Sequence, residues 1–128
     1  MITKLKFAVA IVASAAVGAA AVQGLHAQAK PKAYYVVEFE VLDAAAQRDY
    51  APRIQATQRN VGGRPFGTAA QRVVSFVGTP PKTVAISEWD NMEQLEKYRD
   101  SPAVQSLAPQ RDKAIKIVRS YAVEGPAN

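Results

Sequence analysis

Val84-Ala85-Ile86-Ser87-Glu88-Trp89-Asp90-Asn91 is the stretch from which the fold of the chain can be worked out. It begins with apolar and β-branched residues and reaches an aromatic side chain at Trp89, a composition that predicts a strand. Asp90 or Asn91 can then accept the free backbone N–H groups of a first helical turn. A second helix is expected to begin at Ser101, because serine caps helices and the proline that follows it is tolerated at the first helical position.

The residues from Ala33 to Val41 alternate in character, as in a strand that packs one face on a core. One face of this predicted strand carries Tyr35, Val37, Phe39 and Val41. The other face carries Tyr34, Val36, Glu38 and Glu40. The first strand therefore has one strongly apolar face and one face that mixes apolar and acidic side chains.

A helix is expected after this strand, with Asp43 placed to cap it. Its inward-facing residues recur at helical spacing, at Tyr50, Ile54, Thr57 and Val61. Pro52 lies inside this pattern, and because proline removes a donor and clashes one turn back, the helix either kinks there or restarts near Asp49. Gly62-Gly63 ends the helix, since glycine readily takes the left-handed conformation of a helix stop.

Two further segments complete the expected sheet. Arg72 to Val77 is predicted to form a hairpin with Thr83 to Trp89 across a turn at residues 78–82. The closing strand runs from Ile115 to Val123, with Ile115, Ile117, Arg119 and Tyr121 on one side. The resulting order β-α-β-β-α-β is the ferredoxin-like split βαβ arrangement, an α+β fold with an antiparallel sheet and helices on one face.

The first 29 residues have the features of a secretory signal peptide. Lys4 and Lys6 form a basic start, residues 7–22 carry no charge, and Ala27-Gln28-Ala29 fits a small-x-small cleavage site. Cleavage is expected before Lys30, with cleavage after Ala27 as the alternative. A retained membrane anchor is the competing interpretation, but a membrane span usually needs about 20 apolar residues. We therefore expect residues 30–128 to form a single periplasmic or secreted domain that makes no membrane contact after cleavage.

Composition excludes several classes of function. Without the signal peptide, fourteen Lys and Arg residues face eleven acidic ones, and the net charge falls from +5 to +3. The basic residues are scattered singly, which is typical of a solvated surface and not of a nucleic-acid-binding patch. The chain has no cysteine, and its one histidine, His26, lies in the predicted signal peptide. The expected domain therefore lacks a Ser-His-Asp or Cys-His nucleophile and the usual zinc and haem ligands, so neither a cofactor nor a metal is expected.

Four short motifs follow one another at a set spacing over roughly Ala33 to Gly125. They are Gly62-Gly63-Arg64, Phe76-Val77-Gly78, Val84-Ala85-Ile86-Ser87-Glu88-Trp89, and Tyr98-Arg99-Asp100-Ser101-Pro102 with Gln105 and Arg111. In their order and spacing they resemble domain-of-unknown-function family 1330. The chain departs from the pattern of that family at three places: Thr68-Ala69 stand where an Arg-Gly pair is common, Val77 replaces a frequent Glu, and Val104 replaces a Tyr.

The resemblance implies the dimeric α+β barrel superfamily, in which two ferredoxin-like domains pack their open sheet faces together. Relatives in that superfamily include cofactor-free monooxygenases, haem-handling proteins and muconolactone isomerases, whereas the family itself has no settled activity. The apolar residues expected on the open sheet face are Val36, Val84, Ile86 and Val118. An apolar patch of this kind on a small monomer marks an interface, so we expect a symmetric homodimer that forms through this face.

The mixed faces of two strands supply a candidate ligand pocket. Its expected lining residues are Tyr34, Val36, Glu38, Ile86, Glu88 and Trp89. If Glu38 and Glu88 lie in a barrel interior, burial would raise the pKa of each carboxyl and could make a proton-transfer base. The alternative is that each carboxylate pairs with an arginine, such as Arg72 or Arg119, or lies in solvent. Trp89 could stack on an aromatic ligand, but a single Trp at a strand end is more often a core anchor.

Two classes of function remain open. One is an exported domain that binds a small hydrophobic or aromatic ligand, or has a structural role, without catalysis. The other is a cofactor-independent enzyme, similar to a monooxygenase or an isomerase, that uses a carboxylate base on a small hydrophobic or aromatic substrate. The lack of His and Cys in the expected domain and the altered family positions favour the first class.

Overall fold

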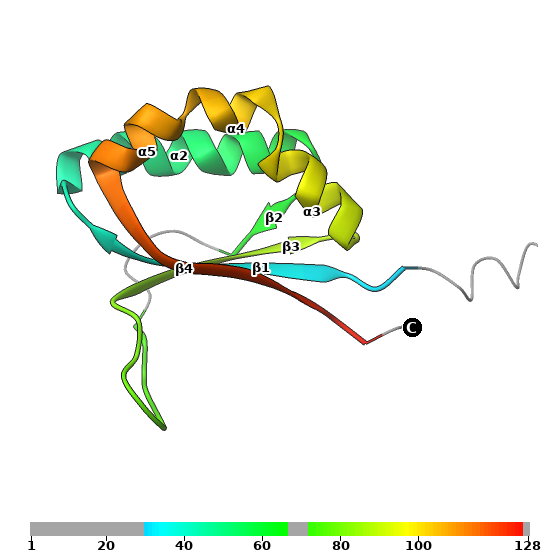
Figure 1. Cartoon of the computed structure of the whole chain (residues 1–128), viewed down its shortest axis with the longest axis horizontal. Helices are drawn as coiled ribbons and strands as arrows, with labels where there is room; N and C mark the ends of the chain where they lie inside the picture. Colours follow the sequence, from blue (N-terminus) through cyan, green and yellow to red (C-terminus); the bar gives the residue numbers. More distant parts are fainter. Residues whose placement is uncertain (1–29, 67–71, 127–128) are drawn as a thin grey trace, which may run out of the picture. The chain divides into compact units, whose positions relative to one another are not determined.

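A computed structural model describes residues 30–66 and 72–126 of the chain (Figure 1). The predicted signal peptide, residues 1–29, lies outside the described residues. Pro31–Pro126 form one compact unit. Its strands are β1 (Ala33–Val41), β2 (Arg64–Pro65), β3 (Thr83–Trp89) and β4 (Ile115–Glu124). Its helices are α2 (Ala44–Asn60), α3 (Met92–Arg99), α4 (Pro102–Ser106) and α5 (Ala108–Ala114).

The four strands form one antiparallel sheet in the order β2-β3-β1-β4. Figure 1 shows that α2, α3, α4 and α5 all lie on one face of this sheet. We call the face without helices the open face. The chain therefore runs β-α-β-β-α-β, with α3, α4 and α5 together taking the place of the second helix. This arrangement confirms the predicted ferredoxin-like α+β fold.

Strand β1 lies inside the sheet, and its alternating side chains divide between the two faces. The side chains that pack toward the helices include Tyr35, Val37 and Phe39. Val36 lies opposite Ile86 of β3 on one side and opposite Tyr121 of β4 on the other. Because directly opposed residues of paired strands share a face, these three side chains lie on the open face. The alternation predicted for this strand is confirmed.

Two clusters of buried side chains fill the space between the sheet and the helices. The first contains Ala33, Trp89, Leu95 and Tyr98. The second contains Phe39, Tyr50, Ala114 and Ile115. Leu95 and Tyr98 are the buried residues of α3, as their helical spacing predicts. Removing these large apolar side chains from water is the main force that holds the helices on the sheet.

Three of the helices begin at residues expected from the sequence. Asp43 caps α2, because its Oδ1 accepts from the backbone N–H of Ala46 at 3.0 Å. Asn91 caps α3 and Ser101 caps α4 in the same way. Gly62 follows the end of α2 with a φ of 88°, the left-handed conformation that a side chain would make costly.

Helix α2 runs unbroken through Pro52, so the expected restart near Asp49 is wrong. Proline inside a helix loses a hydrogen bond and crowds the preceding turn, but the buried Tyr50 and the inward-facing Ile54 pack against the core on either side of it and hold the helix in place. Within residues 30–66 and 72–126, no helix is long and apolar enough to span a membrane.

The hairpin expected between residues 72–77 and β3 is wrong. The strand next to β3 is the short β2, and the Phe66 N–H adds a hydrogen bond to the Ile86 carbonyl at 2.8 Å. These hydrogen bonds occupy the free edge of β3 from Ile86 to Glu88, so residues 72–77 cannot pair with β3 there. Residues 72–82, which we call the arm, instead leave the sheet on the side away from the helices (Figure 1).

Strand β4 contains a register shift, and residues before and after it that are two positions apart lie on opposite faces of the sheet. Arg119 lies opposite Glu38 of β1, yet Ile117 lies opposite the next β1 residue, so Val118 has no partner in the ladder. The expected common face of Ile115, Ile117, Arg119 and Tyr121 is therefore wrong. Ile115 is buried under the helices, whereas Arg119 lies on the open face with Glu38.

Candidate functional site

The open face brings together five of the six residues predicted to line a pocket. The strand register arranges its side chains in three rows: Tyr34 with Glu88 and Val123, Val36 with Ile86 and Tyr121, and Glu38 with Val84 and Arg119. The central row is apolar apart from one phenol hydroxyl, and each outer row contains one carboxylate. The face is therefore an apolar strip with an acidic residue on either side.

Glu38 is held in an ion pair by the neighbouring strand. The Arg119 guanidinium donates from Nη2 at 2.7 Å and from Nε at 3.2 Å to the same atom, Glu38 Oε1. The Glu38 side chain is only 10% exposed, while the Arg119 side chain is 62% exposed. The guanidinium therefore lies on the solvent side of the carboxylate, and the expected pairing of Glu38 with Arg119 is confirmed.

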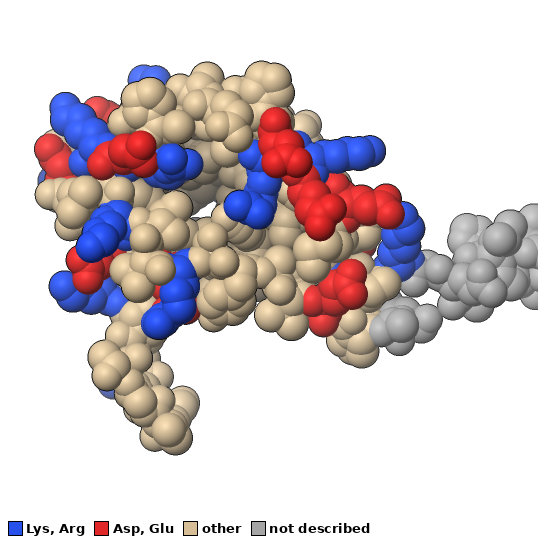
Figure 2. Space-filling view, in the orientation of Figure 1, with Lys and Arg blue, Asp and Glu red and all other residues tan. Residues whose placement is uncertain are grey.

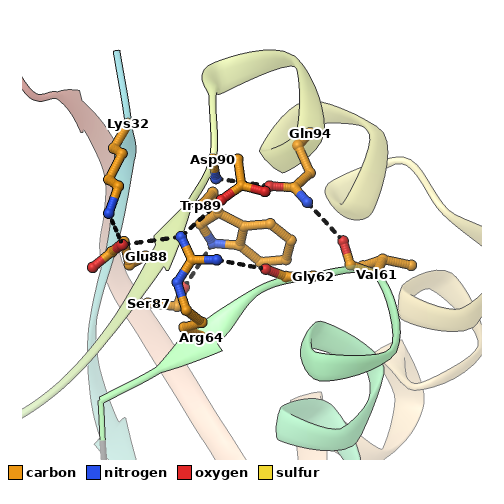
Figure 3. Close-up of polar contacts among 9 residues, drawn as sticks. All are labelled: Lys32, Val61, Gly62, Arg64, Ser87, Glu88, Trp89, Asp90 and Gln94. Atoms are coloured by element: carbon orange, nitrogen blue, oxygen red, sulfur yellow. Dashed lines mark hydrogen bonds and ion pairs between the residues drawn. The ribbon is translucent and has the colours of Figure 1, made fainter. Parts of the chain in front are cut away.

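Glu88 accepts hydrogen bonds from two cations (Figure 3). Lys32 Nζ and Arg64 Nη2 each lie 2.9 Å from Glu88 Oε1. The Arg64 guanidinium also lies 3.0 Å from Asp90 Oδ1, so it bridges two carboxylates at the end of β3. Lys32 precedes β1 and Arg64 belongs to β2. The ion pairs therefore join three segments that lie far apart in the chain.

Both carboxyls are weaker bases than an ordinary glutamate. The hydrogen bond from Arg119 is the largest influence on the pKa of Glu38 and lowers it, outweighing the partial burial, which acts in the opposite direction. The hydrogen bonds from Lys32 and Arg64 lower the pKa of Glu88 in the same way. Burial does act to raise each pKa, but hydrogen bonds from charged donors stabilise the ionised form and outweigh it, as the ion-pair alternative implied.

Trp89, the sixth predicted pocket residue, lies on the opposite face of the sheet. It is fully buried, its indole Nε1 donates to Ser87 Oγ at 2.9 Å, and the centroid of its ring lies 4.7 Å from that of the Tyr98 ring. Its polar atom is satisfied inside the core, so it is no part of the open face. The favoured interpretation of Trp89, as a core anchor, is confirmed.

The turn between α2 and β2 packs directly on this indole. A Cβ atom at Gly63 would lie 2.5 Å from Trp89 Cη2, closer than carbon atoms approach in proteins. A Cβ atom at Gly62 would lie 2.5 Å from Gln94 Nε2. Figure 3 shows Arg64, Gln94 and Trp89 converging on this turn. Gly62-Gly63-Arg64 is therefore a structural motif in this chain, since its glycines admit neighbouring side chains and its arginine pairs with β3.

Sequence reasoning missed Lys32 and Arg64 as the partners of Glu88. Arg64 carried one signal, its place directly after Gly62-Gly63. That signal indicated a turn and did not indicate which strand the turn would meet. Lys32 carried none, because it lies in the short lead-in before β1 and its contact depends on how β1 pairs with β3.

An open depression of about 490 Å³ lies beside the start of β4. Its lining residues are Leu42, Arg111, Asp112, Ile115, Lys116 and Ile117, none of which was predicted as a site residue. Arg111 and Asp112 form an ion pair of 3.1 Å at this site. Among residues 30–66 and 72–126, no group of three or more His, Cys, Asp or Glu side chains could hold a metal ion.

Three solved structures share the fold of this chain. SnoaB, a cofactor-independent oxygenase from Streptomyces nogalater, is 14% identical with a TM-score of 0.57, and the match covers 77% of this chain and 96% of that one. A protein of unknown function from Rhodopseudomonas palustris is 13% identical with a TM-score of 0.55, covering 74% and 81%. A DABB family protein with a ferredoxin-like fold from Mesorhizobium loti is 10% identical with a TM-score of 0.51, covering 76% and 97%. At these identities the likeness shows the fold alone.

No curated protein matches the chain. A family model described as a domain of unknown function, DUF1330, matches residues 32–126. The matched range contains every strand and helix of the described residues, and it includes the motifs on which the resemblance to this family depends. The chain therefore belongs to the DUF1330 family.

Proposed function

We propose that the chain is an exported, non-catalytic domain that dimerises through the open face of its sheet and binds a small hydrophobic or aromatic ligand there. The observation that carries this proposal is the composition of the open face. Its central row is apolar, and the carboxylates beside that row are already engaged in ion pairs. Such a face suits contact with apolar groups better than proton transfer.

The charges of the open face suit a second copy of the same face. Glu38 and Glu88 are paired as described above, and Glu40 pairs with Lys82 at 3.3 Å. The carboxylates of two identical faces can therefore approach each other while each keeps its own cation. Tyr121 and Val123 are about half exposed at this face, so an isologous contact around a twofold axis would remove apolar surface from water in both copies.

The ligand class follows from the same side chains. Two twisted sheets that meet face to face would enclose a space lined by Tyr34, Val36 and Tyr121, and ligand sites are mainly apolar with few polar groups. A charged ligand would have to compete with an existing ion pair for Glu38 or Glu88. An uncharged aromatic compound would leave both pairs in place, so it is the ligand that we expect.

An enzyme with a carboxylate base is the second candidate. It requires a carboxyl with a pKa near the working pH, and the pKa values of Glu38 and Glu88 are lowered instead. The likeness to SnoaB concerns the fold alone. The non-catalytic function therefore agrees better with the charges of the site.

The oligomeric state tests the interface. Light scattering of the purified protein at micromolar concentration is expected to give twice the monomer mass. Val36→Glu places an unpaired charge in the centre of the apolar row and is expected to give monomers with an unchanged circular dichroism spectrum. Ala103→Glu, an equal charge change on the exposed surface of α4, is the matched control and should remain dimeric. A monomeric wild type would contradict the proposal.

A thermal-shift screen of small uncharged aromatic compounds tests ligand binding. At least one compound is expected to raise the melting temperature of the wild type and of Glu38→Gln by similar amounts, because Glu38 acts through its ion pair and not on the ligand. A response that disappears in Glu38→Gln would favour the enzyme, and a screen without any response would contradict the proposed ligand class.

Intact-mass measurement of the protein from the periplasmic fraction tests export. The mature chain is expected to begin at Lys30 or Gln28. A chain that keeps Met1 and is found in the membrane fraction would contradict the proposed export.

A further inference from the structure

The arm ends in two apolar side chains that lie almost entirely in solvent. Phe76 is 94% exposed and Val77 is 96% exposed. The tip is a defined turn, in which Ser75 Oγ donates to the Gly78 carbonyl and Gly78 has a φ of 79°. Figure 2 shows the arm standing clear of the rest of the described chain, with no charge at its tip. Two adjacent exposed apolar residues on a projecting turn indicate a contact with another molecule.

The arm is long enough to pass a second sheet. It leaves the sheet on the side of the open face (Figure 1). The chain from Lys82 to Phe76 can extend about 20 Å at roughly 3.3 Å per residue. Sheets that pack face to face lie about 10 Å apart. In a dimer formed through the open face, the tip of the arm would therefore extend beyond the sheet of the second copy, toward its helices.

The strand order indicates which edge of the second copy the arm would pass. The strands β2 and β3 occupy one side of the sheet, and β4 forms the opposite edge. When two such sheets face each other around a twofold axis parallel to the strands, the β2 edge of one lies beside the β4 edge of the other. This rotation keeps the strand direction, so each end of the first sheet lies beside the corresponding end of the second sheet.

The register identifies the end of β4 that lies beside the arm. Thr83, where the arm joins β3, and Ile117 of β4 are both opposite Phe39. The arm therefore leaves the sheet at the level of Ile117. The open depression beside the start of β4 lies at this level, since Ile117 lines it together with Ile115 and Leu42.

We propose that the dimer has its twofold axis parallel to the strands and that Phe76 and Val77 of one copy pack on the apolar part of this depression, at Leu42, Ile115 and Ile117, in a second copy. This inference rests on the dimer of the proposed function and adds a reciprocal exchange of arms to it. The depression, of about 490 Å³, is large enough, since an apolar cavity of about 150 Å³ holds benzene. Leu42 is 58% exposed and Ile117 is 39% exposed, so both offer apolar surface to the tip of an arm.

A membrane surface is a less suitable partner for the tip. Residues 73–81 contain no Lys or Arg, so the tip has no basic side chain to attract anionic lipid headgroups. Lys82, at the base of the arm, is already paired with Glu40. Two apolar side chains without such charges bind a bilayer only marginally. A second copy requires no electrostatic attraction, because the sheet interface brings the tip to its binding site.

The first test measures dimer strength. In Phe76→Ser with Val77→Ser, the dissociation constant of the dimer, from sedimentation equilibrium, is expected to rise at least tenfold. Val61→Ser removes a half-exposed valine at the end of α2 and should leave the constant unchanged. A tip variant that dimerises as tightly as the wild type would overturn the inference and leave the sheet interface intact. A wild type that is monomeric would overturn both.

The second test locates the tip. Because the chain has no cysteine, Val77→Cys combined with Leu42→Cys introduces the only thiols. A short bis-maleimide is expected to link two chains in the double variant and in neither single variant. Equal linking in the Val77→Cys variant alone would place the tips beside each other and overturn the inference. Sedimentation of the wild type with phosphatidylglycerol vesicles, lost in the tip variant while the dimer is unaffected, would overturn it in favour of a membrane.

Discussion

Replacing Gly63 by alanine would bring a methyl group into steric clash with the indole ring of Trp89. The added Cβ would lie 2.5, 2.7 and 2.9 Å from three carbon atoms of that ring. The ring has little room to move, because Trp89 is fully buried, donates a hydrogen bond to Ser87 Oγ and packs against Tyr98. The turn that carries Gly63 is also held, since Arg64 is paired with β3. The substitution is therefore expected to destabilise the fold.

The size of the effect follows from two opposing contributions. Overpacking a core costs about 1–3 kcal/mol, and a rigid neighbour favours the upper end of that range. Glycine to alanine also reduces the entropy of the unfolded chain, which offsets roughly 0.5–1 kcal/mol. The net loss is about 2 kcal/mol. For a domain of this size, that loss corresponds to a fall of roughly 10 °C in melting temperature.

A double-mutant cycle separates the clash from a general effect on the backbone. Trp89→Phe removes the outer ring atoms that the new methyl group would meet, so Gly63→Ala should cost at least about 1 kcal/mol less in that background. Gly78→Ala is the control, because its Cβ would meet nothing within 4 Å and only the positive φ opposes it. Urea unfolding of the four proteins of the cycle gives the coupling energy. An equal loss in both backgrounds would refute the proposed contact.

Two further predictions concern pH. The folded pKa of Glu38 lies below its ordinary value of 4.5, so its ion pair stabilises the fold above that pH and is lost as pH falls further. Urea midpoints should therefore fall less steeply below about pH 4.5 in Glu38→Gln than in the wild type, and parallel curves would contradict this. Burial raises the pKa of Tyr50 from 10.0 to about 12. As pH rises between these values, the unfolded chain loses the phenol proton before the folded one, so the free energy of unfolding should fall. Burial also raises the pKa of Tyr98, so phenolate absorbance should show late titration that Tyr50→Phe reduces and does not abolish, and a single transition near pH 10 would count against this.

Local sequence patterns predicted the elements whose signals lie within one segment. Alternation identified both faces of β1, and the capping residues Asp43, Asn91 and Ser101 marked the starts of three helices. The second strand was predicted wrongly because Arg72 to Val77 is richer in strand-forming residues than β2. The edge of β3 is instead taken by the segment that leaves α2 at Gly62, and pairing, not intrinsic preference, decides where a strand forms.

For the candidate site, the sequence predicted which residues share a strand face, but it did not predict which charged residues from other segments contact them. Alternation placed Tyr34, Val36 and Glu38 together correctly, but the charges that control the carboxylates come from distant segments. The pairs Glu38 with Arg119, Glu88 with Lys32 and Glu88 with Arg64 join residues 81, 56 and 24 positions apart. Their contact depends on strand order and on the register shift at Val118, and neither is contained in a local pattern.

The strand order β2-β3-β1-β4 also determines when the domain can close during synthesis. Strand β1 is made first, yet one of its two neighbours is β4, which ends at Glu124. Until that last strand has been made, one whole side of β1 has no hydrogen-bonding partner, and the second core cluster lacks Ala114 and Ile115. Because a domain folds as a unit, the nascent domain stays open until the residues up to Glu124 have been made. An open chain can be threaded through a narrow membrane pore, which is the state that the proposed export requires.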